Sequence, residues 1–390
     1  MLLQNKKVAI VGGGPGGLTL ARLLQLKGVN VQVYERDINE YARVQGSPLD
    51  MHEESGWAAL RSAKLVDEYK KHVIQGADKK VIVNAQAEVF FSDHENKSNE
   101  ELGGEPPRLE IGRGALRKVL LGALQQETVV WDSQFISMEK ENEGWLMHFK
   151  NGSSVYADLV IAADGANSKI RPYLTEIKAF YSGVTMVEIN IDNAKKATPH
   201  IYELMNGGKI MAYGNGRNIL GGQKGNGDLC FYASFKTDEN RVTDSGLDFS
   251  DRTQLLNWFK KEYADWSSIW HELFDNAIMP AVTRRIYCMP LDQNWEPLSN
   301  LTLLGDAAHV MPPFAGEGAN TSMFDALELT ECLSSSQYPT LREAIADYEK
   351  SMRHRAAKAA KQSLDNGNLM HSDDALDKML KIFRHSSPGK

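Results

Sequence analysis

Residues 8–17 read VAIVGGGPGG, an apolar run followed at once by a cluster of glycines. Gly12, Gly14 and Gly17 have the spacing G-x-G-x-x-G, and leucines at helical spacing come directly after them. In this pattern the first glycine allows a tight turn, the second lets a pyrophosphate approach the backbone, and the third lets the helix pack on the strand. A second apolar run ends at Glu35, where a carboxylate can bind ribose hydroxyls. This order of elements predicts a dinucleotide-binding site.

The composition of the 390 residues is that of an ordinary globular protein, with 42% hydrophobic and 24% charged residues. The net charge of −7 argues against a nucleic-acid partner, because phosphate binding needs a concentrated basic surface. No apolar stretch approaches the roughly 20 residues that span a bilayer. Cys230, Cys288 and Cys332 fit no metal spacing and no complete disulfide scheme. We therefore expect a cytoplasmic protein without a metal or a membrane partner, and we expect it to be a monomer.

The remaining pattern indicates several elements after the first strand, helix and strand. Strand-like residues 80–83 and 87–91 suggest a small side sheet. Short β-rich segments divided by Asn and Gly turns fill residues 180–236 and predict an inserted antiparallel sheet. Residues 322–384 have a helical pattern, which we expect to break near residues 366–368 because the sequence there is Asn-Gly-Asn.

A second glycine motif follows the apolar residues 301–304. Asp306, at the carboxyl end of this predicted strand, can accept hydrogen bonds from sugar or ribityl hydroxyls. Gly316 and Gly318 allow the backbone to run flat against a ring, and the positive end of the next helix suits a reduced flavin. A plain strand-to-helix turn capped by Asn320 is the structural alternative.

The motifs together resemble those of the single-component FAD-dependent aromatic hydroxylases. That family has an N-terminal glycine turn, an Asp-Gly motif that corresponds to residues 164–171, and a Gly-Asp motif that corresponds to Gly305 and Asp306. The resemblance covers nearly the whole chain in the right order. Within the family the chain is most similar to the tetracycline-inactivating monooxygenases, at residues 34–37, 49–52, 157–161, 234–237 and 305–318.

The resemblance implies two cofactors, FAD and NADPH. Glu35 and Arg36 would hold the adenosine ribose, Asp50 and Arg113 would contact FAD, and Arg43 would meet NADPH. The expected cofactor-binding residues are Gly12, Gly14, Gly17, Glu35, Arg36, Arg43, Asp50, Arg113, Asp164, Asp306, Pro313, Gly316, Gly318 and Asn320.

The expected fold is α/β, with a Rossmann-like FAD-binding domain, an inserted substrate domain of α+β type built on an antiparallel sheet, and a C-terminal helical segment. The FAD-binding domain is discontinuous, with residues 1–178 and 284–330. Residues 179–283 form the substrate domain, and residues 331–390 form the helical segment that bridges the two.

The chain departs from the tetracycline enzymes in the expected substrate site. Where those enzymes place glutamine, arginine and histidine, this chain has Glu188, Lys209 and Cys230, and a phenylalanine is replaced by Leu220. Replacing arginine by lysine loses a planar, bidentate donor. Each position has a plain alternative as a strand residue, and Glu188 and Lys209 could pair with each other. The expected substrate-binding residues are Glu188, Lys209, Met211, Leu220, Cys230 and Phe314.

The implied chemistry belongs to the flavin, which forms a hydroperoxide from O₂ after reduction by NADPH, so we assign no catalytic side chain. The expected function is hydroxylation of a phenolic or enolic polycyclic small molecule such as a tetracycline antibiotic. Hydroxylation of another aromatic metabolite, without tetracycline activity, is the alternative substrate hypothesis.

Three alternative protein classes differ in the features they require. A flavin-dependent halogenase would carry a W-x-W-x-I-P motif, which is absent. A plain NAD-dependent dehydrogenase would leave the Gly305 and Asp306 motif unexplained. A flavin-binding or ligand-sequestering protein without catalysis stays open at this stage.

Overall fold

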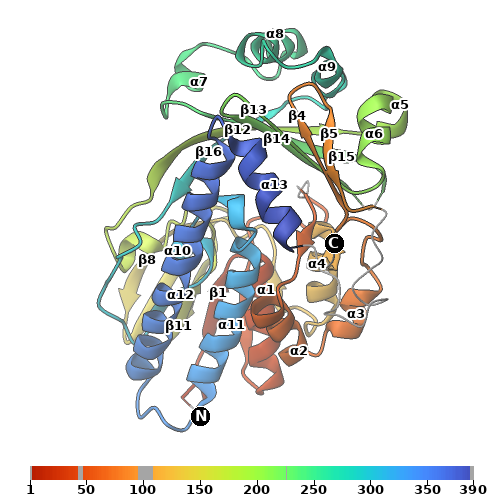
Figure 1. The fold of residues 1–390 in the computed structure, drawn as a ribbon. Helices are drawn as coiled ribbons and strands as arrows, with labels where there is room; N and C mark the ends of the chain where they lie inside the picture. Colours follow the sequence, from red (N-terminus) through yellow and green to blue (C-terminus); the bar gives the residue numbers. More distant parts are fainter. Residues whose placement is uncertain (1, 43–46, 95–108, 225, 387–390) are drawn as a thin grey trace.

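The computed structural model describes residues 2–42, 47–94, 109–224 and 226–386. Arg43, the expected NADPH contact, lies outside these residues. The chain forms two layers, a parallel sheet with its helices in the lower half of Figure 1 and a larger sheet above it. The expected fold class is confirmed, because a Rossmann-like parallel sheet, further sheets and C-terminal helices are all present.

The lower layer is a five-stranded sheet with the order β17-β11-β1-β2-β7, in which every neighbouring pair is parallel. Every residue of β1, β11 and β17 is buried, as expected for strands of a parallel sheet that is covered on both faces. The strands are β1 (Val8–Val11), β2 (Val31–Tyr34), β7 (Val129–Val130), β11 (Leu159–Ala162) and β17 (Leu301–Leu303). The helices of this layer are α1 (Pro15–Leu26), α2 (Ala58–Ser62), α3 (Val66–Lys70), α4 (Arg113–Gly122), α10 (Asp306–His309) and α11 (Gly318–Ser334).

Two small antiparallel sheets flank the lower layer. The first has the order β10-β9-β8, and a turn at Asn151 and Gly152 joins two of its strands. The second contains only β3 and β6, and it lies on the floor of the cavity described below. Their strands are β8 (Phe135–Glu141), β9 (Gly144–Phe149), β10 (Ser154–Ala157), β3 (Leu49–Asp50) and β6 (Glu110–Ile111).

The upper layer is a seven-stranded sheet with the order β16-β12-β15-β14-β13-β4-β5. Its neighbouring strands are antiparallel except for the parallel pair of β13 and β4. The strands are β4 (Lys80–Asn84), β5 (Val89–Ser92), β12 (Phe180–Ile191), β13 (Lys209–Gly214), β14 (Arg217–Gln223), β15 (Leu229–Lys236) and β16 (Val282–Cys288).

One expectation about this layer needs correction. The predicted side sheet is not separate, because β4 and β5 extend the upper sheet through the pairing of β4 with β13. Residue 284, where we expect the chain to return to the first domain, lies in β16, which pairs with β12 along the edge of the same sheet. Local strand patterns identified these segments but carried no information about their partners.

The outer face of the upper sheet is covered by helices and packed with aromatic side chains, including Trp258, Phe259, Trp270 and Phe274. The covering helices are α5 (Ala194–Ala197), α6 (Pro199–Met205), α7 (Arg241–Asp244), α8 (Arg252–Glu262) and α9 (His271–Asp275). The inner face points toward the parallel sheet. Because successive strand residues alternate between faces, each strand contributes every second residue to the space between the layers.

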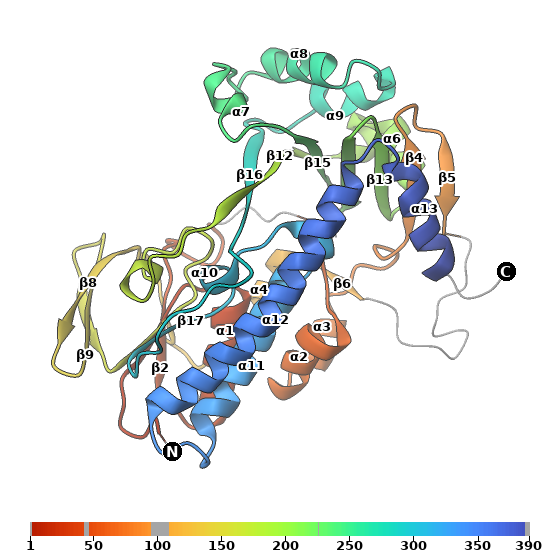
Figure 2. The same ribbon diagram turned by 60° about the vertical axis from the view of Figure 1, so that its left-hand side comes forward.

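The thirty-residue helix α12 (Leu341–Met370) runs past both layers, and α13 (Ala375–Ser386) returns against β4 and β13 (Figure 2). The expected break near residues 366–368 is wrong, since α12 is continuous there. Gly367 serves packing rather than termination, because a Cβ at this position would lie 2.6 Å from the ring of Phe314. Among the described residues, no helix is both long and apolar enough to cross a membrane.

Candidate functional site

A cavity of about 3120 Å³ lies between the two layers. Sites for drug-sized ligands measure about 300–1,000 Å³, so this cavity has room for a dinucleotide and a second ligand. The expected site residues that line it are Gly12, Gly14, Gly17, Glu35, Arg36, Asp50, Arg113, Asp164, Glu188, Lys209, Met211, Leu220, Asp306, Pro313, Phe314, Gly316 and Gly318.

The glycine turn between β1 and α1 has the three properties that its spacing predicts. Gly12 has a φ of +114°, and a Cβ there would overlap the carbonyl oxygen of Ala163. A Cβ at Gly17 would overlap the carbonyl oxygen of Gly12. Gly14, in contrast, has no atom within 4 Å of the position of a Cβ, and it precedes the first turn of α1. The backbone at Gly14 therefore stands open to the cavity beside a helix N-terminus, where a phosphate is favoured.

Glu35 is held at the end of β2 by hydrogen bonds from the backbone. Its carboxylate accepts from the N–H of Gly13 at 2.6 Å and from the N–H of Asp37 at 3.0 Å. Arg117 lies beside this pair, at 2.8 Å from the carboxylate of Asp37 and 3.8 Å from that of Glu35. The turn and the acid, 22 residues apart, are thus one unit.

Next to Asp50, which lines the cavity, a histidine lies between two carboxylates. The ring of His52 lies 3.4 Å from Asp50 and 3.2 Å from Glu317. Hydrogen bonds to Asp50 and Glu317 raise the pKa of His52 to about 9, so the imidazole is charged at neutral pH. Asn320 holds the backbone of Asp50 and His52, because its side chain donates to the carbonyl of Asp50 and accepts from the N–H of His52. Its side chain is buried and is not part of the cavity lining.

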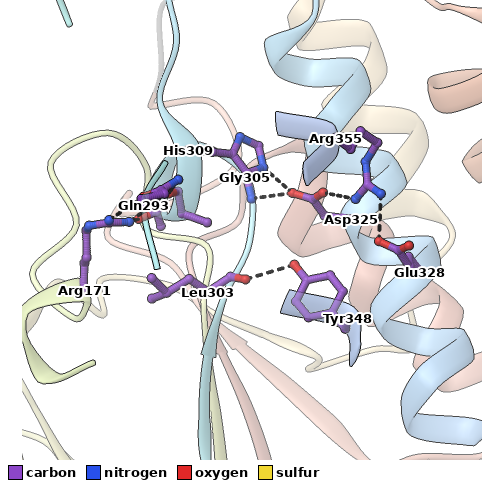
Figure 3. A network of polar contacts seen from close by, with 11 residues as sticks. Arg171, Gln293, Leu303, Gly305, His309, Asp325, Glu328, Tyr348 and Arg355 are labelled. Atoms are coloured by element: carbon purple, nitrogen blue, oxygen red, sulfur yellow. Dashed lines mark hydrogen bonds and ion pairs between the residues drawn. The ribbon is translucent and has the colours of Figure 1, made fainter. Parts of the chain in front are cut away.

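The turn that presents Asp306 rests on a buried ionic network (Figure 3). Asp325 is fully buried and accepts from the N–H of Gly305 at 2.9 Å. It also contacts His309 at 2.5 Å and Arg355 at 2.7 Å. Burial opposes ionisation of Asp325, but the attraction of its carboxylate to His309 and Arg355 is stronger and lowers the pKa of Asp325. The network fixes the backbone below Asp306, whose own side chain is exposed to the cavity.

Hydrogen bonds from Arg171 join this turn to the Asp164 motif, residues 164–171. Arg171 is buried and donates to the carbonyls of Ala307 and Ala308 and to the side chain of Gln293, as Figure 3 shows. Asp164 accepts from the N–H of Lys169 at 2.9 Å, and burial raises its pKa. The Asp164 motif and the turn after Gly305 are therefore connected by hydrogen bonds.

The opposite wall of the cavity is the inner face of the upper sheet. Its apolar side chains include Met186, Met211 and Leu220, and Phe314 packs against them from the lower layer. Cys230 is fully buried and is not part of the lining. A direct contact between Cys230 and a ligand would need a shift of the surrounding chain.

Glu188 and Lys209, the two charged residues expected at the substrate site, do not pair with each other. Lys209 forms an ion pair with Glu110 of β6, and Glu188 forms one with Arg284 of β16 at 2.5 Å. Burial raises the pKa of Glu110 to about 7, against the attraction of Lys209. The pairing of Glu188 with Lys209 that the sequence left open is thus wrong.

Comparison with known proteins places this architecture in a family. The model of a family described as FAD binding domain matches residues 5–363. The chain belongs to this family. It is 25% identical to the monooxygenase penA of Penicillium thymicola, over 97% of this chain and 98% of that protein. It is thus an FAD-dependent monooxygenase by family.

Two solved structures extend the comparison. A putative FAD-containing monooxygenase from Photorhabdus luminescens is 26% identical, with a TM-score of 0.75 over 94% of this chain and 99% of that one. The tetracycline destructase Tet(55) is 16% identical, with a TM-score of 0.76 over 99% of this chain and 96% of that one. At this identity the second likeness concerns the fold.

The residues of this FAD-binding chain fit the cofactor. Gly14 leaves space for a pyrophosphate at the start of α1, Glu35 stands where a ribose would lie, and Asp306 presents an exposed carboxylate. Each group matches the chemistry of the part it would meet, because phosphates bind backbone N–H groups and carboxylates accept from sugar hydroxyls.

Sequence reasoning missed three residues of the FAD-binding half. Arg117 lies one helical turn after Arg113, and this spacing alone could have placed both on the cavity side of α4. His52 and Asp325 had no such signal. Their importance comes from partners that lie far away in the sequence, namely Glu317 for His52 and Arg355 for Asp325.

Proposed function

We propose that this chain is an NAD(P)H-dependent hydroxylase of an aromatic or enolic, largely planar small molecule. The observation that carries the proposal is the continuity of the cavity from the glycine turn to the apolar inner face of the upper sheet. A ligand on that face would lie in the same cavity as the cofactor. Bound FAD would supply the redox chemistry that activates O₂.

The apolar wall favours a polycyclic ligand over a small polar one. Five methionines, which are flexible and polarisable, line the cavity and could follow the outline of a ring system. They are Met186, Met211, Met289, Met311 and Met370. The ring of Phe314 packs with Met186, Met211 and Met370, and it lies 5.4 Å from the ring of His371. Such a wall would exclude water and orient a flat substrate.

The polar groups of the wall support tetracycline only as a moderate or poor substrate. Lys209 is already paired with Glu110, and Cys230 is buried behind the lining. A lost charged hydrogen bond costs about 1.5–3 kcal/mol, or roughly 10- to 150-fold in affinity. The proposed substrates are therefore phenols or enols other than tetracycline itself. A cytoplasmic, monomeric enzyme that uses NADPH completes the proposal.

The test is turnover by the purified holoenzyme. We expect a yellow protein with non-covalent FAD that oxidises NADPH, consumes O₂ and forms a hydroxylated product with polycyclic phenols or enols. A protein that binds these compounds without consuming NADPH or NADH would instead be a ligand-binding protein. Hydrogen peroxide without hydroxylated product for every compound would also contradict the proposal.

The tetracycline part needs its own comparison. We expect a low kcat/KM for tetracycline in the native enzyme and a gain in Lys209→Arg, because arginine restores a planar donor. Met211→Leu serves as the matched control, since it changes the same strand without changing a donor. Fast turnover by the native enzyme with no gain in the arginine variant would remove Lys209 from the substrate site.

A further inference from the structure

Arg284 has a different position from the other cations around the cavity. It lies on the edge strand β16 directly opposite Met186 of β12, so the two side chains share a face of the sheet. Ile286, two residues along, packs with Met186 and Phe314 on that same face. Arg284 and Met186 both line the cavity, and the side chain of Arg284 is 50% exposed. Its charge therefore stands at the border of the apolar wall.

A buried carboxylate fixes the orientation of this guanidinium. The Nε–H of Arg284 donates to Glu188 at 2.5 Å, and the side chain of Glu188 is only 6% exposed. The other oxygen of Glu188 accepts from Asn190 at 3.2 Å, and Asn190 accepts from Lys224 at 2.7 Å. The cluster thus contains two cations and one carboxylate, which leaves a net positive charge.

The terminal nitrogens of Arg284 are available. Within the described part of the chain, the Nε–H of Arg284 is its one side-chain group that donates a hydrogen bond. The neighbouring cations already have other partners. Lys209 pairs with Glu110, and Arg117 pairs with Asp37. Arg113 donates to the carbonyl of Ser47, and Arg171 donates to the carbonyls of Ala307 and Ala308. Arginine binds two-oxygen anions through paired N–H groups in one plane.

We propose that Arg284 orients the substrate by binding a delocalised two-oxygen anion, either a carboxylate or an ionised β-dicarbonyl enol, on the ring system that covers the methionine wall. This inference rests on the proposed function and specifies its substrate class. Glu188 acts as a positioning residue, because it holds the guanidinium by Nε and leaves the terminal nitrogens facing the ligand. The substrates are thus acidic aromatic or enolic compounds.

The experiment measures binding to the oxidised holoenzyme through the change in flavin absorbance, without NADPH. For a carboxylate the probes are 1-hydroxy-2-naphthoate and its amide, and for an enolate they are 4-hydroxycoumarin and 4-methoxycoumarin. We expect at least one anionic probe to bind about 10-fold or more tightly than its neutral partner. The pair that shows the preference identifies the anion. Equal affinity within both pairs, or binding of no probe, would overturn the inference.

Substitutions then test whether Arg284 causes the preference for the anionic probe. Arg284→Met should weaken binding of the preferred anion about 10- to 100-fold and leave the neutral partner nearly unchanged. Arg285→Met is the matched control, because this adjacent arginine also borders the cavity but donates to Asn240 and lies on the other face of the strand. If both variants lost the same affinity, the effect would be general charge and the inference would be wrong.

Glu188→Gln separates substrate binding from a purely structural ion pair. The amide oxygen can still accept the Nε–H, while the negative charge beside the ligand disappears. Affinity for the anion should therefore stay equal or increase in Glu188→Gln. A loss as large as that of Arg284→Met, for the neutral partner as well as for the anion, would show that the pair only supports the fold. Should Arg284→Met fail to fold, Arg284→Lys tests the same point, because it keeps the charge but loses the planar pair and should bind the anion several-fold more weakly.

These results are independent of turnover. Selective anion binding without hydroxylation would overturn the proposed function and retain the role of Arg284. Hydroxylation of neutral phenols with no preference for anions would do the reverse.

Discussion

The two walls of the cavity are built by different means. On the FAD-binding wall the main chain defines the site, at Gly12, Gly14 and the turn around Gly305, and side chains such as Asp325 hold that main chain in place. On the wall formed by the upper sheet the side chains themselves define the surface, and their partners come from other strands and from the lower layer. A backbone site permits few substitutions, whereas a side-chain surface can change with modest cost.

The largest effect of this difference is expected at the glycines of the FAD-binding wall. A Cβ at Gly12 would meet backbone, which cannot move, and the φ of +114° adds strain of its own. We expect Gly12→Ala to lower the free energy of unfolding by about 5 kcal/mol and to abolish FAD retention. Chemical denaturation and the flavin absorbance of the purified protein measure both effects. Gly14→Ala is the control, since open space surrounds that position, and it should keep the fold. An unchanged stability for Gly12→Ala would break the comparison.

Substitution of Asp325, which holds the turn at Gly305, should destabilise the protein nearly as much as Gly12→Ala. Asp325→Ala removes the shared partner of His309 and Arg355 and leaves buried charge uncompensated. We expect a loss of about 4 kcal/mol in the free energy of unfolding. Glu328→Ala is the matched control, because Arg355 would still be paired with Asp325. Equal losses in the two variants would mean that the network has no special role for the turn.

A buried histidine on the upper-sheet side should make stability depend on pH. His371 donates from Nδ1 to the carbonyl of Gly367, and its Nε2 accepts from Ser234 and Asn218. Burial lowers its pKa from 6.5 to about 4. Between these values the unfolded chain binds a proton that the folded chain does not, so stability falls as the pH falls.

The expected loss from this residue is about 3 kcal/mol between pH 6.5 and pH 4. Denaturation at several pH values should show that His371→Gln removes this part of the pH dependence. His354→Gln, at an exposed position of α12, should leave it intact. The prediction is wrong if the native protein and His371→Gln lose stability in parallel on acidification.

The smallest effect is expected at Gly367 of α12, which packs against Phe314 of the cavity lining. Here a Cβ would meet the ring of Phe314, which can rotate or shift. We expect Gly367→Ala to cost about 1–2 kcal/mol of stability, to change KM for the substrate several-fold and to leave FAD content unchanged. Loss of FAD in this variant would show that the two walls are not independent.

Much of the FAD-binding half could be predicted from local sequence. The spacing of Gly12, Gly14 and Gly17, with Glu35 at the end of the next strand, specifies a turn and a helix N-terminus within one continuous segment. These features are local, because φ angles and strand-to-helix turns depend on neighbouring residues. The likeness to a known family added Asp50 and Arg113, which the residue pattern alone would have left as surface charges.

Only the tertiary structure decided the other wall. In the structure, β4 and β5 belong to the upper sheet, and α12 continues through Gly367. Cys230 lies behind the cavity lining, Glu188 pairs with Arg284, and Lys209 pairs with Glu110. Arg284 stands 96 residues from Glu188 in the sequence, and only strand register brings them together. The physical reason is range: backbone conformation is set by adjacent residues, whereas the charge, burial and free donors of a side chain depend on partners that folding brings from distant parts of the chain.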